Sequence, residues 1–83
     1  MNDRTLGGRI YLARVGNGKC SRSEFGRRVA EMEGRPSPYR GQTVADWENG
    51  VEPSLATLHA MAKVAGVRVE WLVFRSGVLS AAA

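Results

Sequence analysis

The stretch QTVADWENG, residues 42–50, combines an apolar pair at helical spacing with side chains that form hydrogen bonds. Val44 and Trp47 are three residues apart and would face a core from one side of a helix. The positions left exposed carry amide, hydroxyl and carboxylate groups: Gln42, Thr43 and Asp46. A solvated polar face is one interpretation of this pattern. The other is a short helix that presents a hydrogen-bonding surface to a partner.

No other group of residues has the spacing of a catalytic or metal site. His59 is the only histidine and Cys20 the only cysteine, so one chain can form neither a disulfide nor a zinc quartet. Glu31 and Glu33 are two residues apart and would project from different sides of a helix. The segment GNGK, residues 16–19, lacks the spacing of a phosphate-binding loop and predicts a turn. We therefore expect no enzyme, no cofactor and no small-molecule substrate.

The charge balance favours a polyanionic partner. The 83 residues include 12 Lys and Arg against 8 Asp and Glu, which gives a net charge of +4. Ten of the cations are arginines, whose planar guanidinium matches phosphates and guanine edges. Five of them lie close together: Arg22, Arg27, Arg28, Arg35 and Arg40. A solvated basic face is the alternative, but their excess over nearby glutamates favours contact with phosphates.

Length and composition suit one small domain. Eighty-three residues, 43% of them hydrophobic, bury only a small core, so a partner subunit is plausible. Residues 1–15 carry several charges and no unbroken apolar run, so we expect no signal peptide and no transmembrane helix. The single cysteine fits a reducing compartment, and we expect a cytoplasmic location.

Capping residues and glycines delimit the first two helices. Apolar spacing predicts a helix over residues 6–15. Ser21 and Glu24 have the spacing of a capping box at the start of a helix over residues 22–33, which Gly34 would end. The apolar stripe of this helix would be Phe25, Val29 and Met32.

Prolines mark the start of the next helix. Pro36 biases the residue before it away from helical angles. Ser37 is a natural N-cap, and Pro38 fits the first helical position. These residues predict a helix over residues 38–49, which Gly50 would end.

Two more helices complete the pattern. Ser54 would cap a helix over residues 55–65, which Gly66 would end. A last short helix would contain Val69, Trp71, Leu72 and Val73, and Gly77 would end it. The inward residues of the longer helix would be Leu55, Leu58, Met61 and Ala62. The β-branched residues of the last segment also suit a strand: Val67, Val69 and Val73. No second strand is available for pairing, so we expect a compact all-α domain of five helices.

In this order and spacing the chain resembles the phage repressor and Cro class of helix-turn-helix proteins, also called the XRE class. The resemblance is carried by LGGRIYLAR, CSRSEFGRR, QTVADWENG, PSLATLHAMAKVAGV and VEWL. It implies a five-helix, lambda repressor-like fold, with an arm at residues 1–5, the DNA-binding domain at 6–76 and a tail at 77–83. The helices over 22–33 and 38–49 would form the helix-turn-helix, with the second in the major groove of double-stranded DNA.

The resemblance assigns the exposed face of the second of these helices to the bases. Gln42 would donate to N7 of adenine and accept from N6, and Asp46 would accept from N4 of cytosine or repel phosphate. Arg22 stands where family members commonly carry a glutamine that touches the DNA backbone, and would clamp a phosphate. The implied DNA-binding residues are Arg22, Tyr39, Arg40, Gly41, Gln42, Thr43, Asp46 and Asn49.

The resemblance also implies two roles away from the bases. Arg14 and Glu48 correspond to an ion pair that joins the first helix to the third. Trp71, Phe74 and Val78 would form a dimer interface, with covering of the core as the alternative. A dimer would hold its two recognition helices about 34 Å apart, one turn of DNA.

The chain departs from the family pattern in several places. The segment from Gly26 to Gln42 is longer than a usual turn of about three or four residues allows. Extra helical turns, or a loop over residues 35–40, would account for the surplus. Gly26 stands where the family usually has alanine, Gly41 where it often has a larger base-reading residue, and Asp46 where it often has a cation or amide. These departures predict a weak or unusual operator preference.

Together these patterns predict a sequence-specific, repressor-like transcriptional regulator, bacterial or phage-encoded, that binds an inverted repeat as a homodimer. The alternative is a module that binds a protein partner through the same fold, such as the antitoxin of a toxin–antitoxin pair.

Overall fold

The computed structural model describes residues 2–74, and these form five α-helices and one π-helical turn. Helix α1, Leu6–Leu12, runs directly into the π-helical turn η1, Ala13–Gly18. The other helices are α2 (Arg22–Glu33), α3 (Gly41–Glu48), α4 (Leu55–Ala65) and α5 (Val69–Phe74). The predicted all-α class is confirmed, whereas the predicted end at Gly77 and the tail at 77–83 lie outside the described residues.

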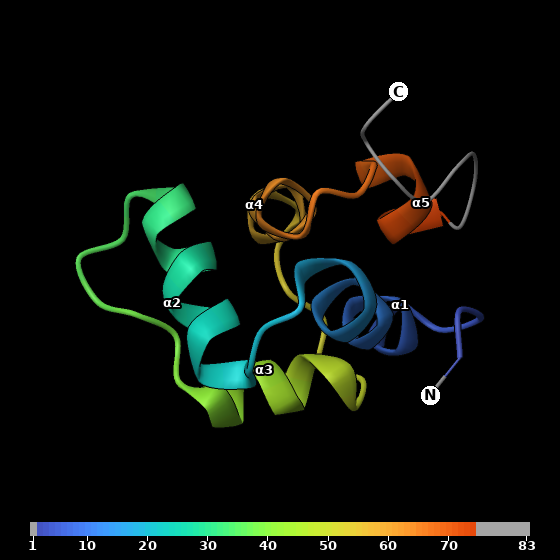
Figure 1. The fold of residues 1–83 in the computed structure, drawn as a ribbon, viewed down its shortest axis with the longest axis horizontal. Coiled ribbons are helices and arrows are strands. Elements are labelled where there is room, and N and C mark those ends of the chain that lie inside the picture. The colour runs from blue at the N-terminus through green and yellow to red at the C-terminus, as the bar shows by residue number, and fades with distance from the viewer. Residues whose placement is uncertain (1, 75–83) are drawn as a thin grey trace.

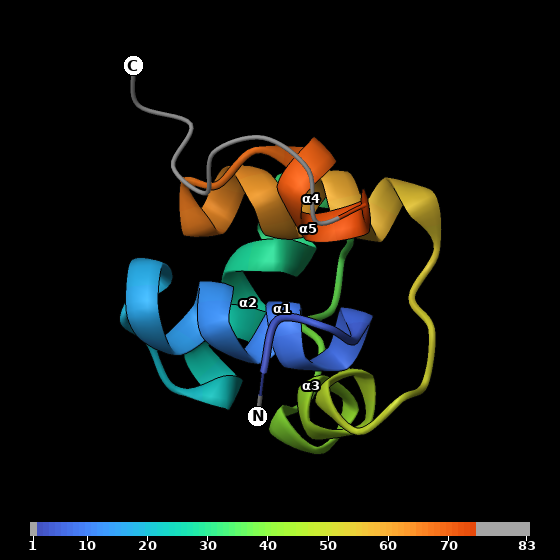
Figure 2. The ribbon, with the colours of Figure 1, turned by 90° about the vertical axis from the view of Figure 1, so that its right-hand side faces the viewer.

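The helices surround a single core. Helix α1 lies in the middle, with α3 on one side and α4 and α5 on the other, and α2 packs against both α3 and α4 (Figures 1 and 2). The core contains apolar side chains from every helix: Ile10, Ala13, Phe25, Val29, Val44, Trp47, Leu58, Ala60, Met61, Ala62, Ala65, Val67, Trp71 and Leu72. None of the described helices is long and apolar enough to cross a membrane.

Helices α2 and α4 begin and end at the predicted residues. Ser21 Oγ and Ser54 Oγ each accept a hydrogen bond from the backbone amide three residues further on. Gly34 and Gly66 have φ angles of 73° and 72°, the left-handed conformation that ends many helices. Only half of the predicted capping box forms, because the Glu24 carboxylate accepts hydrogen bonds from arginines of its own helix.

Two residues predicted to be buried are exposed. Met32 is 49% exposed and Leu55 is 61% exposed. Met32 lies in the last turn of α2, where it lines an open hollow against α4, and Leu55 lies in the first turn of α4. The predicted stripes are therefore correct in the middle of each helix and wrong at one end.

The first helical segment is longer than predicted. Helical structure continues past Val15 as η1 and ends at Lys19, whose φ angle is 53°. Asn17 Nδ2 donates hydrogen bonds to the carbonyl oxygens of Ala65 and Gly66 at the end of α4. These bonds hold the segment that was predicted to be a simple turn, and they tie η1 to α4.

The long connection between α2 and α3 is a loop over residues 34–40. The prediction that a helix begins at Pro38, with Ser37 as its N-cap, is wrong. Arg40 is extended, with φ −75° and ψ 155°, and the first helical residue is Gly41. Of the two explanations for the longer segment, extra helical turns or a loop, the structure shows the loop (Figure 1).

Tyr39 holds this loop against the helices. Its ring packs edge-to-face on Trp47, with ring centroids 4.8 Å apart, and its hydroxyl donates to the Glu33 carboxylate. The same carboxylate accepts from Thr57 Oγ1 at 2.9 Å, which links α2 to α4. The Arg35 guanidinium lies 4.3 Å from the centre of the Tyr39 ring, a cation–π distance. Because these contacts turn residue 39 inward, the chain stays extended until α3 begins.

Arg9 ties α1 to α5 in a way that the sequence pattern did not predict. Its guanidinium is buried and donates to the carbonyl oxygens of Leu72 and Val73, at 2.7 and 3.0 Å. A third donor binds the carbonyl oxygen of Asp3 at 3.0 Å. A cation at these carbonyls satisfies the acceptors that a helix C-terminus leaves unpaired.

Gly26 explains one departure from the family pattern. A Cβ atom at this position would lie less than 3.0 Å from the carbonyl oxygen of Tyr39, a backbone atom that has little freedom to move. The alanine that is usual in the family therefore does not fit beneath this loop.

We expect Gly26→Ala to lower the free energy of unfolding by about 1–3 kcal/mol, because the added methyl group overpacks the contact between α2 and the loop. Gly16→Ala is the matched control, since a Cβ atom there has no neighbour within 4 Å. Urea unfolding of both variants measures the difference. Equal stability of Gly26→Ala and the wild type would show that the loop does not approach α2 this closely.

Candidate nucleic-acid interface

Helix α3 has one buried side and one exposed polar stripe. Val44 and Trp47 are buried, as predicted, and are 0% and 6% exposed. Gln42, Asp46 and Asn49 follow one another at spacings of four and three residues, which places them on one face of the chain. Gln42 and Asn49 are exposed, and Asp46 is half-buried. We call these three residues the α3 stripe.

The side chains of the α3 stripe form hydrogen bonds within the helix. Gln42 Nε2 donates to Asp46 Oδ1 at 3.0 Å. Asn49 Nδ2 donates to the carbonyl oxygen of Ala45 at 2.8 Å. Thr43, beside the stripe, is half-buried.

The other residues predicted near this helix divide into two groups. Arg40 is exposed at the N-terminal end of α3. Gly41 is half-buried, and a Cβ atom there would lie 3.0 Å from Ser23 Oγ, so the start of α3 packs closely on the start of α2. Tyr39 is turned towards Trp47. The structure therefore brings Arg40 and the α3 stripe to the surface but leaves Tyr39 and Gly41 packed against the protein.

A buried carboxylate fixes the position of α3. The side chain of Glu48 is 0% exposed, and Arg14 binds both of its oxygens, with Nε–Oε2 at 2.6 Å and Nη2–Oε1 at 3.3 Å. The structure thus brings the predicted pair together across η1 and α3. Arg22, from the first turn of α2, also binds this carboxylate, with Nε–Oε1 at 3.0 Å. We call Arg14, Glu48 and Arg22 the arginine–glutamate triad.

The role of Arg22 in the triad was not predicted. The only signal in the sequence was an arginine at a position where the family commonly has glutamine. Its side chain is 44% exposed, and only Nε binds a protein group among the described residues. Glu48 therefore anchors the base of the guanidinium and leaves its two terminal nitrogens available to solvent or to an anion.

The remaining arginines of α2 are paired with carboxylates. Arg27 binds Glu24 and Glu31, and Arg28 binds Glu24 at 2.7 Å. Hydrogen bonds from Arg27, and then from Arg28, lower the pKa of Glu24 from its ordinary value of 4.5 to about 2. The predicted basic face is thus largely neutralised on α2. Among the described residues, its part without a carboxylate partner is formed by Arg35, Arg40 and the terminal nitrogens of Arg22.

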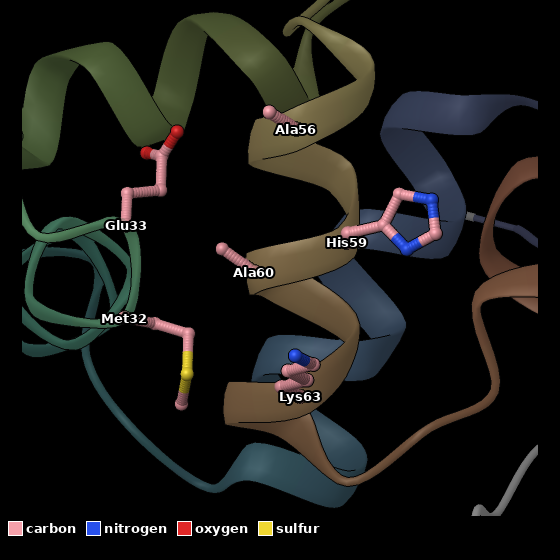
Figure 3. A pocket seen from close by; sticks show the side chains of 6 residues that line it. All are labelled: Met32, Glu33, Ala56, His59, Ala60 and Lys63. Atoms are coloured by element: carbon pink, nitrogen blue, oxygen red, sulfur yellow. The ribbon is translucent and has the colours of Figure 1, made fainter.

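A shallow hollow between α2 and α4 contains mixed groups. It is lined by Met32 and Glu33 from α2 and by Ala56, His59, Ala60 and Lys63 from α4 (Figure 3). The His59 ring points away from the Glu33 carboxylate, so the two do not form an acid–base pair (Figure 3). Across residues 2–74, no cluster of three or more His, Cys, Asp or Glu side chains could hold a metal ion.

Cys20 is half-buried and packs against the core. Burial raises the pKa of its thiol above the ordinary value of 9.0. The thiol is therefore protonated at neutral pH, which suits a packing role.

The residues predicted for a dimer interface lie in different environments. Trp71 is 8% exposed and packs in the core. Its position agrees with the alternative prediction, that this residue covers the core. Phe74, in the last turn of α5, is 74% exposed. Val78 lies outside the described residues.

We expect Glu48→Ala to lower the free energy of unfolding by about 3–5 kcal/mol, because it leaves the buried Arg14 guanidinium without its carboxylate. Arg22→Ala removes the exposed partner of the same carboxylate and should lower the free energy of unfolding by less than about 1 kcal/mol. Thermal or urea unfolding compares the two variants. A small and equal decrease in the free energy of unfolding of both variants would show that Glu48 does not fix α3.

Comparison with known proteins gives one match. A family model described as "Helix-turn-helix" matches residues 41–72, which cover α3, α4 and most of α5. Searches of curated proteins and of solved structures gave no match. The matched segment begins at α3, directly after the long loop that departs from the usual short turn. Residues 41–72 thus match the helix-turn-helix family, and the all-helical fold is consistent with a Cro- or repressor-like helix-turn-helix protein.

Proposed function

We propose that this protein is a sequence-specific transcriptional regulator that places α3 in the major groove of double-stranded DNA and represses transcription as a homodimer. The helix-turn-helix match supports DNA binding in general. The observation that supports base reading by α3 is the α3 stripe. It is a hydrogen-bonding surface on a short helix whose opposite side is packed into the core.

The support behind α3 suits a helix that reads bases. Its buried side is fixed by Val44 and Trp47 in the core and by the salt bridge from Arg14 to Glu48. Helix α2 and the loop at 34–40 hold its N-terminal end through Tyr39. Rigid support matters because side chains discriminate between bases only when their positions are fixed relative to the groove.

Arg22 and Arg40 are suited to contact phosphates of the DNA backbone near the start of α3. The terminal nitrogens of Arg22 are exposed, and Glu48 orients them by holding Nε. Arg40 is exposed at the start of α3. Because phosphate contacts position a protein without reading sequence, these two arginines would set the register in which the α3 stripe meets the bases.

Phe74 supports the homodimer. An aromatic side chain that is 74% exposed at the end of α5 is a plausible centre for an interface between two copies. Two copies related by a two-fold axis would bind an inverted repeat with half-sites about 34 Å apart. A dimer bound across one operator would exclude other proteins from that DNA, which is the simplest route to repression.

The experiment that tests this proposal is selection of bound duplexes from a random DNA pool by the purified protein at physiological salt. We expect enrichment of an inverted repeat with half-sites one helical turn apart. A single enriched half-site would support α3 as the reader but contradict the dimer. No enrichment, with only weak salt-sensitive binding, would contradict the proposal and favour the protein-interaction module.

We expect Arg22→Ala to weaken binding to the selected site and to random duplex by similar factors. It should also reduce the slope of log K against log salt concentration by about 0.9, the value for one phosphate contact. Arg68→Ala is the control, because Arg68 is exposed between α4 and α5, away from α3, and carries the same charge. Fluorescence anisotropy at several salt concentrations gives the slopes. Equal slopes for the two variants would show that Arg22 does not contact phosphate.

A further inference from the structure

We infer that the surface between α2 and α4 is a docking site for another protein, and that it takes a peptide segment with an apolar side chain next to a carboxylate. This site goes beyond DNA binding. Helix α4 and the C-terminal end of α2 lie on one side of α1, whereas α3 lies on the opposite side (Figures 1 and 2). A partner at this surface therefore leaves α3 accessible.

Two adjoining hollows form the docking surface. The first is the hollow between α2 and α4 in Figure 3. The second is lined by Arg28, Glu31 and Met32 from α2 and by Lys63 and Val64 from α4. Because Met32 and Lys63 line both hollows, the two are continuous, and we call them together the α2–α4 groove. Residues 56–64 of α4 border it over about 12 Å, the length of about four residues of an extended peptide.

Met32 gives the groove an exposed apolar floor. It continues the apolar stripe of α2, in which Phe25 and Val29 are fully buried, yet Met32 itself is 49% exposed. Its side chain extends from α2 into the space beside α4 (Figure 3). Methionine adapts its shape to different apolar partners and is enriched at protein interfaces. An apolar side chain of a partner would therefore complete the stripe that α4 leaves uncovered.

The carboxylates of the groove already have partners within the protein. Glu31 accepts a hydrogen bond from Arg27 Nη1 at 2.9 Å. Glu33 accepts from the Tyr39 hydroxyl and from Thr57 Oγ1. Neither carboxylate is left to attract a basic segment of a partner.

The cations of the groove, in contrast, have unused donors. Lys63 is exposed and forms no ion pair within residues 2–74. Arg28 binds Glu24 through Nε at 2.7 Å, and no described residue binds its terminal nitrogens. Both cations line the same hollow as Met32, so a carboxylate next to an apolar side chain on Met32 would lie within reach of them. Charge complementarity of this kind selects the partner.

The same groups disfavour a nucleic acid in the groove. A phosphate backbone gains nothing from the apolar floor at Met32. The carboxylates of Glu31 and Glu33 line the groove as well, and they would repel a polyanion. The combination of an apolar floor with two available cations suits an acidic, apolar peptide better.

The first experiment selects binders from a displayed library of random short peptides, with the full chain immobilised. We expect enrichment of peptides in which a large apolar residue lies close to aspartate or glutamate. An enriched peptide is then synthesised with a fluorescent label, and its affinity is measured by anisotropy. Enrichment of basic peptides, or of none, would overturn the inference.

Met32→Ser tests the apolar floor. We expect it to weaken binding of the labelled peptide by about 5- to 30-fold, the range of an interface residue that contributes strongly. Val51→Ser is the matched control, because Val51 is also exposed, at 58%, but lies in the connection between α3 and α4. Equal affinities for the two variants would show that the peptide does not bind at Met32.

A charge exchange tests the role of Lys63. The acidic residue of the peptide is replaced by lysine, and both peptides are measured on each protein. The wild type should prefer the acidic peptide, and Lys63→Glu should reduce or reverse this preference by about fivefold or more. Arg68→Glu makes the same change of charge at an exposed position outside the groove and should keep the preference. An unchanged preference in Lys63→Glu would contradict the assignment.

Two further measurements separate this site from the other surfaces. The peptide-bound protein should bind duplex DNA as tightly as the free protein does, and competition between peptide and DNA would overturn the placement of the site. Sedimentation of the wild type and of Met32→Ser tests whether a second copy of this chain fills the groove. A dimer that dissociates only in Met32→Ser would overturn the assignment to another protein.

Discussion

The buried carboxylate of Glu48 is the constraint on which the rest of the interface depends. A charge that is removed from water must be paired, and Arg14 supplies two hydrogen bonds to it from η1. Since η1 is tied in turn to α4 through Asn17, one ion pair fixes α3 relative to two other elements. Arg22 uses the same carboxylate from α2. The group that stabilises the fold thus also orients a cation at the surface.

Tyr39 adapts the fold to a longer connection between α2 and α3. In a short turn the two helices position each other directly, whereas here a loop over residues 34–40 intervenes. Tyr39 packs on Trp47 and binds Glu33, so the loop is anchored at the residue just before Arg40. Gly26 leaves room for that anchor. The longer connection therefore still ends at a defined start for α3.

Local signals predicted much of this fold, and contacts distant in sequence account for what they missed. Helices α2 and α4 were predicted to the residue, because Ser21, Ser54, Gly34 and Gly66 act within one turn of each helix end. The start of α3 was not predicted, because it depends on Tyr39 meeting side chains from two other helices. At the candidate interface, helical periodicity predicted the exposed polar face of α3. The family resemblance predicted the contact between Arg14 and Glu48. The pairing of Arg22 with Glu48 had no local signal.

The central claim is that α3 and the start of α2 form the surface that meets DNA. The most direct measurement is titration of the ¹⁵N-labelled protein with duplex DNA, followed through its backbone amide resonances. The account predicts that the largest shifts occur in residues 40–49 and near Arg22, with small shifts at the hollow lined by Met32 and His59. Large shifts at that hollow or along α5, with α3 unchanged, would contradict it.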